Sequence, residues 1–329
     1  MDTRVLGRTG RPVSVVGLGC WQLGADWGEV SPDVAMGILH AAVDAGVTFL
    51  DTADVYGDGR SERLVGRLLA ERGPQAGLTV ATKMGRRAAP HVAEAYTLDA
   101  FRGWTDRSRT NLGVEVLDLV QLHCPPTEVY RREETYDALD TLVAEGRIAA
   151  YGVSVETVEE ALTAIARPAV ATVQIILNAF RRKPLERVLP AAAAAGVGII
   201  ARVPLASGLL TGKFDAATTF AADDHRQYNR DGAAFDVGET FSGVPYDVGV
   251  GAAREVAGLT PAGATTAQLA LRWIIDQVGV TTVIPGASRP EQARANAGAA
   301  DLAPLDAATL EGLRAIYDER IRANVHDRW

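Results

Sequence analysis

The sequence is poor in cysteine. Its 329 residues include only Cys20 and Cys124, too few for a disulfide framework. Chains of this kind are typical of reducing compartments. No apolar run reaches the roughly 18 residues that a membrane-spanning helix needs, and the opening stretch, MDTRVLGRTG, lacks the apolar core of a signal peptide. These absences predict a cytoplasmic protein with no membrane partner.

Positive charge is also scarce. Lysine and arginine number 33 against 41 aspartates and glutamates, which gives a formal net charge of −8. Because nucleic acids and anionic membranes are bound through a basic excess, this balance argues against both as partners, although it leaves room for a basic pocket for one small anion. No Gly-x-Gly-x-x-Gly follows an early strand, so a Rossmann dinucleotide site is not supported. No spacing of His, Cys, Asp or Glu indicates a metal site.

What the sequence does contain is a regular alternation of strand and helix patterns. Apolar, β-prone runs at 15–18, 47–50, 78–82, 116–122, 148–153, 171–176, 197–201 and 281–284 are each followed by a helical pattern. These eight units favour a closed (β/α)8 TIM barrel over an open sheet, and predict one α/β domain over residues 1–329. Extended runs at 5–6 and 13–16 predict an N-terminal β-hairpin cap, and the polar stretch 207–250 predicts a long loop after the seventh strand.

Polar side chains stand at the ends of successive predicted strands. From the second strand to the sixth they are Asp51, Lys83, His123, Ser154 and Gln174. Since the carboxyl ends of all strands in a parallel barrel meet at one rim, these side chains are expected to converge. Taken alone, Asp51 could cap a turn, and the nearby Tyr56 could pack on the next helix. Coincidence at five successive strands is a poor explanation, so the rim is interpreted as an active site.

A series of motifs runs along nearly the whole chain: the LGRTG hairpin, GLGCWQLG, FLDTADVYGDGRSERLVG, VATKMG, LDLVQLHCPP, EGRIAAYGVSVE, VQIILN, PLASGLLTGK and VIPGASRPEQARAN. Their order and spacing resemble the aldo-keto reductase family. The resemblance implies that the family's catalytic tetrad is formed by Asp51, Tyr56, Lys83 and His123. It also implies an NADPH/NADP⁺ cofactor bound extended across the barrel mouth, and reversible reduction of an aldehyde or ketone by hydride transfer.

These four residue types suit carbonyl reduction on chemical grounds. Hydride transfer to a carbonyl leaves an alkoxide that needs a proton, and a free tyrosine, with a pKa of about 10, is a weak donor at neutral pH. A Lys83 ammonium beside Tyr56 is expected to lower that pKa, while Asp51 holds the lysine charged and oriented. A neutral His123 can donate a hydrogen bond that positions the carbonyl oxygen. Tyr56 is therefore the expected general acid.

The resemblance also assigns residues to the cofactor. Ser154 and Gln174 would hold the nicotinamide carboxamide. Arg202 stands where the family usually has an aromatic side chain that stacks on the nicotinamide, and a guanidinium plane can also stack. The segment over the pyrophosphate would contribute Pro204, Leu205 and Lys213. The start of the penultimate helix, where backbone N–H groups favour an anion, would bind the adenosine 2′-phosphate through Gly286, Ser288, Arg289, Gln292 and Asn296.

Two tryptophans follow the first predicted strand. Trp21 and Trp27 are candidates for the wall of the substrate pocket, with core packing as the alternative. A second function fits the same resemblance: a barrel that binds NADPH as a redox-sensing regulatory subunit with little turnover, as some family members associated with ion channels do. The expected substrate is a small carbonyl compound or alcohol, such as a sugar. The sequence specifies neither its identity nor the oligomeric state.

Overall fold

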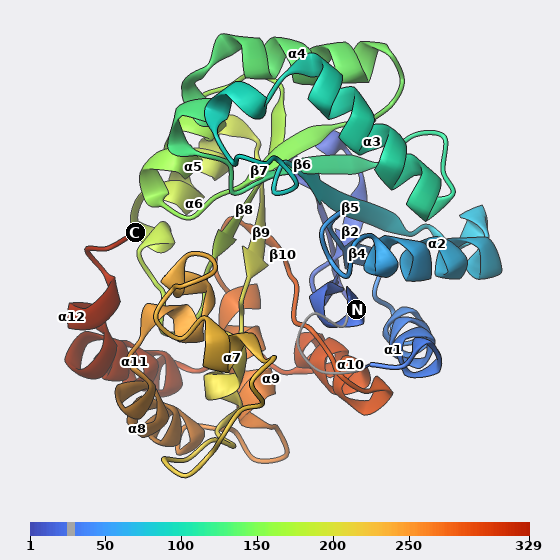
Figure 1. The fold of residues 1–329 in the computed structure, drawn as a ribbon. Helices are drawn as coiled ribbons and strands as arrows, with labels where there is room; N and C mark the ends of the chain where they lie inside the picture. The colour runs from blue at the N-terminus through green and yellow to red at the C-terminus, as the bar shows by residue number, and fades with distance from the viewer. Residues whose placement is uncertain (25–29) are drawn as a thin grey trace.

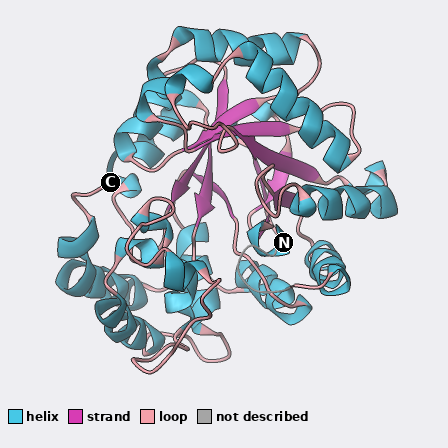
Figure 2. Ribbon diagram, in the orientation of Figure 1, coloured by secondary structure: helices cyan, strands magenta, loops and turns pink. Residues whose placement is uncertain are grey.

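The fold is a parallel barrel surrounded by helices. The computed structural model describes residues 1–24 and 30–329, and Figures 1 and 2 show the strands at the centre with the helices outside them. The barrel strands pair in chain order from β3 to β10, each parallel to the next. Parallel bridges from Val16 to Val283 and from Gly19 to Gly286 close the ring. The predicted (β/α)8 architecture is confirmed.

Most strands end one or two residues later than predicted. The strands are β1 (Thr3–Val5), β2 (Pro12–Ser14), β3 (Leu18–Gly19), β4 (Phe49–Asp51), β5 (Thr79–Met84), β6 (Leu119–His123), β7 (Tyr151–Ser154), β8 (Val170–Ile176), β9 (Gly198–Arg202) and β10 (Val280–Val283). Before β6 and β7, Leu117 and Ile148 still pair through an isolated bridge, so the regular ladder starts later than the apolar runs do. Lys83, His123 and Ser154 therefore lie within the last residues of β5, β6 and β7. There the hydrogen-bonded ladder fixes the direction in which each side chain points.

The N-terminal hairpin closes the end of the barrel at which the strands begin. Strands β1 and β2 pair antiparallel, and the loop between them buries Leu6 beside the barrel-interior side chain of Phe49. Gly7 has a φ of +47°, and a Cβ there would lie 2.2 Å from the carbonyl oxygen of Ala171. The close approach therefore needs glycine. With this end covered, the open end is the rim where the strands finish.

Helices cover the outside of the barrel. They are α1 (Pro32–Asp44), α2 (Arg60–Arg72), α3 (Leu98–Leu112), α4 (Glu133–Ala144), α5 (Val158–Ile165), α6 (Pro184–Ala195), α7 (His225–Tyr228), α8 (Tyr246–Ala257), α9 (Thr266–Ile275), α10 (Pro290–Ala297), α11 (Ala307–Ile316) and α12 (Arg322–Val325). Local sequence sets their starts: Thr157 and Glu160 form a capping box at α5, and Ser31 caps α1. Each helix among the described residues is too short or too polar to cross a bilayer.

The segment between β9 and α8 folds over the rim. Because α8 begins at residue 246, the predicted loop over 207–250 ends slightly earlier than expected. Phe241 in this segment is buried, and the ring of Trp329 packs against Gly238 and Gly243 of the same segment. The Trp329 indole donates to Asp236 Oδ1 at 3.0 Å, and its ring lies 3.6 Å from the Arg181 guanidinium. The segment is thus a packed wall of the rim, and it carries Glu239 toward the site.

Candidate active site

Lys83 lies at the centre of the rim. Its side chain is 1% exposed, and its Nζ lies 2.5 Å from Asp51 Oδ1, 2.9 Å from the carbonyl oxygen of Thr52 and 3.2 Å from the hydroxyl of Tyr56. Burial by itself lowers the pKa of Lys83, but Asp51 and Tyr56 raise it, and the net pKa lies above its usual value. The amine is therefore charged, and it contacts two other residues of the predicted tetrad, Asp51 and Tyr56.

The pKa of Tyr56 differs from the expectation. Burial raises this pKa, the Lys83 charge lowers it by less, and the net value lies above that of free tyrosine. The expectation considered the neighbouring cation alone, whereas the half-buried phenol also has less water around it to solvate its phenolate. Tyr56 is consequently protonated at neutral pH, which is the state that a proton donor needs.

His123 ends β6 beside Tyr56. The two rings meet edge to face, with centroids 5.8 Å apart. Burial, followed by the charges of Arg86 and Lys83, lowers the pKa of His123 well below its usual value, so the imidazole is neutral. Its Nδ1 has no hydrogen-bond partner among the described residues. A neutral imidazole in this position can donate one N–H to a carbonyl oxygen without adding charge to the site.

The second oxygen of Asp51 accepts from two amides. Asp51 Oδ2 lies 3.0 Å from Gln121 Nε2 and 2.8 Å from Gln174 Nε2, and Ser154 Oγ lies 3.5 Å from Gln174 Oε1. Gln174 and Ser154 were expected near the tetrad, whereas Gln121 was missed. The sequence signal that could have found Gln121 is the two-residue period of a strand. Gln121 precedes His123 by two residues on β6, so both side chains point into the barrel.

A cluster of charged side chains that the sequence did not predict holds Arg202. The Arg202 guanidinium, at the end of β9, donates to Glu156 Oε2 at 2.8 Å and lies 3.7 Å from Glu239 Oε2. Arg86 pairs with Glu239 at 2.5 Å and lies 3.6 Å from Glu156. Arg202 is only 7% exposed, and its ion pairs with Glu156 and Glu239 hold the guanidinium in place.

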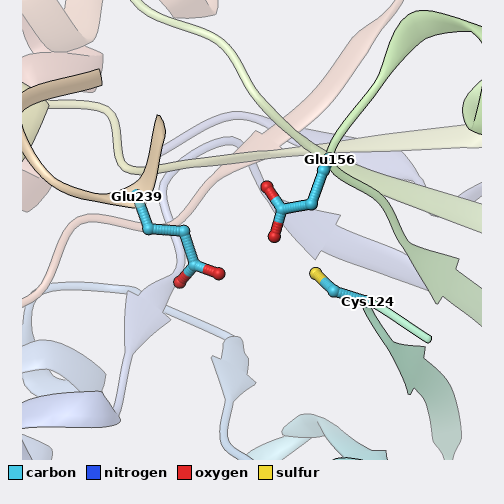
Figure 3. A group of neighbouring side chains, drawn as sticks. All are labelled: Cys124, Glu156 and Glu239. Carbon is cyan, nitrogen blue, oxygen red and sulfur yellow. The ribbon is translucent and has the colours of Figure 1, made fainter. Parts of the chain in front are cut away.

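Figure 3 shows Cys124, Glu156 and Glu239, whose possible ligand atoms lie within 4.8 Å of one another. Burial raises the pKa of Glu156, and although burial also acts on Glu239, Arg86 and Arg202 hold the pKa of Glu239 below its usual value. Burial raises the pKa of the Cys124 thiol to about 12. The guanidinium groups of Arg86 and Arg202 already supply the positive charge that balances the two carboxylates. This favours a cluster of internal ion pairs over a metal centre.

The tetrad opens into a cavity of about 670 Å³. Asp51, Tyr56 and His123 line it, and Lys83 lies behind them. Every residue assigned to the cofactor from the sequence also lines this cavity: Ser154, Gln174, Arg202, Pro204, Leu205, Lys213, Gly286, Ser288, Arg289, Gln292 and Asn296. The structure therefore brings together, at one cavity, side chains drawn from β4 to α10.

Trp21 forms part of the cavity wall near Tyr56. The two rings are stacked with centroids 6.1 Å apart, and Trp21 also lies 4.9 Å from His225 and 5.9 Å from Phe235. Burial lowers the pKa of His225 to about 4, so this ring is neutral at physiological pH. Trp21 thus combines the two predicted roles, packing and pocket wall. Trp27 lies outside the described residues.

The start of α10 presents polar and basic groups to the same cavity. Gln292 Oε1 accepts from the backbone N–H and the hydroxyl of Ser288 at 2.8 and 2.9 Å, and Asn296 donates to the carbonyl oxygen of Gly286 at 3.1 Å. Arg289 is exposed beside this turn. A helix start with a guanidinium next to it attracts anions.

Known proteins share this sequence pattern and fold. The family model described as "Aldo/keto reductase family" matches residues 15–318. The curated protein "Aldo-keto reductase YhdN" of Bacillus subtilis (strain 168) is 31% identical over 303 residues, which cover 90% of this chain and 87% of that protein.

Solved structures agree with this assignment. The glycerol dehydrogenase AKR11B4 from Gluconobacter oxydans is 30% identical with a TM-score of 0.78, covering 100% of this chain and 97% of that one. An aldo-keto reductase from Klebsiella pneumoniae, solved in complex with NADPH, is 25% identical with a TM-score of 0.70, covering 96% and 95%. Because the family match spans nearly the whole chain, this protein belongs to the aldo/keto reductase family.

Proposed function

We propose that the protein reduces an aldehyde or ketone with NADPH, and that Tyr56 is the general acid. The observation that carries the proposal is the meeting of Tyr56, Lys83, Asp51 and His123 at a cavity that also reaches the anion-attracting start of α10. The chemistry of these four residues fits a carbonyl substrate. The cavity as a whole, which includes the start of α10, fits a phosphorylated dinucleotide. The similarity to a reductase solved with NADPH supports the choice of cofactor.

The described residues fit such a cofactor. A cavity of about 670 Å³ falls within the usual range for ligand pockets, roughly 300–1,000 Å³. Ser154 and Gln174 offer a hydroxyl and an amide for the carboxamide, and Lys213 and Arg289 offer cations for the phosphates. When bound, NADPH would supply the hydride.

In the proposed reaction, the Tyr56 hydroxyl gives its proton to the carbonyl oxygen as the carbonyl carbon accepts the hydride. Lys83, at 3.2 Å, stabilises the phenolate that remains, and Asp51 keeps the ammonium oriented. His123 donates an N–H to the carbonyl oxygen and so fixes the substrate. In the reverse direction the Tyr56 phenolate takes a proton from an alcohol. The similarity to a glycerol dehydrogenase supports small polyols or sugars in that direction.

We also propose that residues 1–329 act as one domain in the cytoplasm. The N-terminal hairpin and the C-terminal Trp329 both pack on the same barrel, which supports a single unit. The low cysteine content supports the location.

A turnover assay tests the proposed reaction. We expect the purified protein to oxidise NADPH when small aldehydes, ketones or sugars are added, in proportion to enzyme concentration. The rate should be unchanged after treatment with a chelator, because no proposed step uses a metal. NADPH binding without turnover across such a panel would contradict the proposal and favour the redox-sensing regulatory subunit.

Arg289→Ala is expected to weaken NADPH binding by about ten- to a hundredfold and to leave NADH binding nearly unchanged. The two cofactors differ only in the 2′-phosphate, and a charge-assisted hydrogen bond contributes roughly 1.5–3 kcal/mol. Dissociation constants of both cofactors, measured by fluorescence, check the prediction.

Arg294→Ala is the matched control for this measurement. Arg294 lies on the same helix, pairs with Glu291 at 4.0 Å and does not line the cavity, so its loss should change neither dissociation constant. An equal loss of NADH and NADPH binding in Arg289→Ala, or no loss of either, would contradict the assignment of Arg289 to the 2′-phosphate.

A further inference from the structure

We propose that Gln121 is a positioning residue that fixes the amide of Gln174, so that the site recognises the N–H group of the cofactor's carboxamide. The inference rests on the proposed function, because it takes the nicotinamide dinucleotide as the ligand. It concerns a side chain that does not itself line the cavity.

Gln121, Gln174 and Asp51 form a closed hydrogen-bonded group inside the barrel. Gln121 is fully buried on β6 and donates from Nε2 to Asp51 Oδ2 at 3.0 Å. Gln174, on β8, donates from Nε2 to the same oxygen at 2.8 Å and lies 3.4 Å from Gln121 Oε1. The three side chains come from β4, β6 and β8, every second strand, as in one layer of a barrel interior.

These contacts define which way each amide faces. Asp51 is tied to Lys83 through Oδ1, and as a carboxylate it can only accept hydrogen bonds. The nitrogens of both amides must therefore face Asp51. Gln121 then presents Oε1 to the second N–H of Gln174, so the nitrogen of Gln174 is used on two sides. Rotating the Gln174 amide by half a turn would place oxygen against oxygen at both partners.

The atom that Gln174 leaves for a ligand is consequently an acceptor. Its Oε1 faces Ser154 Oγ at 3.5 Å, and both residues line the cavity, whereas Gln121 does not. A carboxamide can donate an N–H to Gln174 Oε1 and accept from the Ser154 hydroxyl through its own oxygen. An acetyl group of the same shape offers no N–H. The single Ser154 hydroxyl proton, which points to Gln174 Oε1 in this structure, would then have to serve either the acetyl oxygen or Gln174 Oε1, and the other acceptor would be buried without a donor.

Binding measurements with three nucleotides test this inference. The ligands are NADP⁺, its 3-acetylpyridine analogue, and 2′-phospho-ADP-ribose, which lacks the nicotinamide. We expect the wild type to bind NADP⁺ at least about tenfold more tightly than the acetyl analogue, because an unpaired buried acceptor is costly. Gln121→Met, which nearly keeps the volume but removes the amide oxygen and nitrogen, should reduce this preference to about threefold or less, since the Gln174 amide loses one of the partners that orient it. Binding of 2′-phospho-ADP-ribose should not change.

Thr282→Val is the matched control. Thr282 is a fully buried residue of β10 whose hydroxyl has no partner among the described residues, so its loss should leave all three affinities unchanged. A wild-type protein that binds the acetyl analogue as tightly as NADP⁺ would overturn the inference without any variant. So would a Gln121→Met protein that keeps the full wild-type preference. Failure of the wild type to bind 2′-phospho-ADP-ribose would instead contradict the proposed cofactor.

Discussion

Tyr56→Phe is expected to lower kcat for carbonyl reduction by about 10²–10⁴-fold, the usual contribution of a general acid. The variant removes one oxygen, the atom that Lys83 contacts at 3.2 Å, and keeps the ring that packs against Trp21 and His123. Because the phenol is protonated in the wild type, the substitution removes a proton that the reaction needs. The barrel should fold unchanged.

Single-turnover and steady-state rates with a fixed aldehyde, together with the NADPH dissociation constant, check this prediction. The dissociation constant of NADPH should stay within about twofold of the wild-type value, because the hydroxyl acts on the substrate oxygen. Its loss should raise the energy of the transition state and leave cofactor binding unaffected. Tyr96→Phe is a suitable control, because the Tyr96 hydroxyl bonds to His91 at 2.8 Å and does not line the cavity. A Tyr56→Phe enzyme with near wild-type kcat would show that another group supplies the proton.

The candidate site could be predicted from the sequence where it depends on strand ends. Asp51, Lys83 and His123 each terminate an apolar run, and barrel topology alone brings such positions to one rim. The number of strands followed from the same runs. The bounds of the strands could not be predicted in this way, because they depend on which residues of neighbouring strands pair. Leu117 and Ile148, for example, form an isolated bridge that is not continuous with β6 and β7.

The charged cluster around Arg202 shows what the sequence leaves out. Glu239 lies in the irregular segment after β9, where no period relates a residue to its neighbours in space. Its approach to Arg202 and Arg86 depends on how that segment packs, including its contact with the C-terminal Trp329. The direction of the Tyr56 pKa was missed for a related reason, because burial is a property of the assembled rim.

Lys83→Met is expected to lower kcat by at least about a hundredfold and also to destabilise the fold by about 3–5 kcal/mol. The first effect arises because the phenolate left after proton transfer loses its cation, and the pKa of Tyr56 rises further when the Lys83 charge is removed. The second arises because Asp51 is 3% exposed and would keep a buried charge with only the neutral amides of Gln121 and Gln174 as partners.

The double variant Asp51→Asn/Lys83→Met separates the two effects. Removing both charges takes away the buried unpaired carboxylate, so most of the lost free energy of unfolding should return, as measured by urea denaturation. Activity should not return, because the phenol still lacks its ammonium. If the double variant regained kcat along with stability, Lys83 would be a structural partner of Asp51 and not part of the chemistry. If Lys83→Met alone kept its rate and its pH optimum, the link between Lys83 and Tyr56 would be wrong, whatever the distance between them.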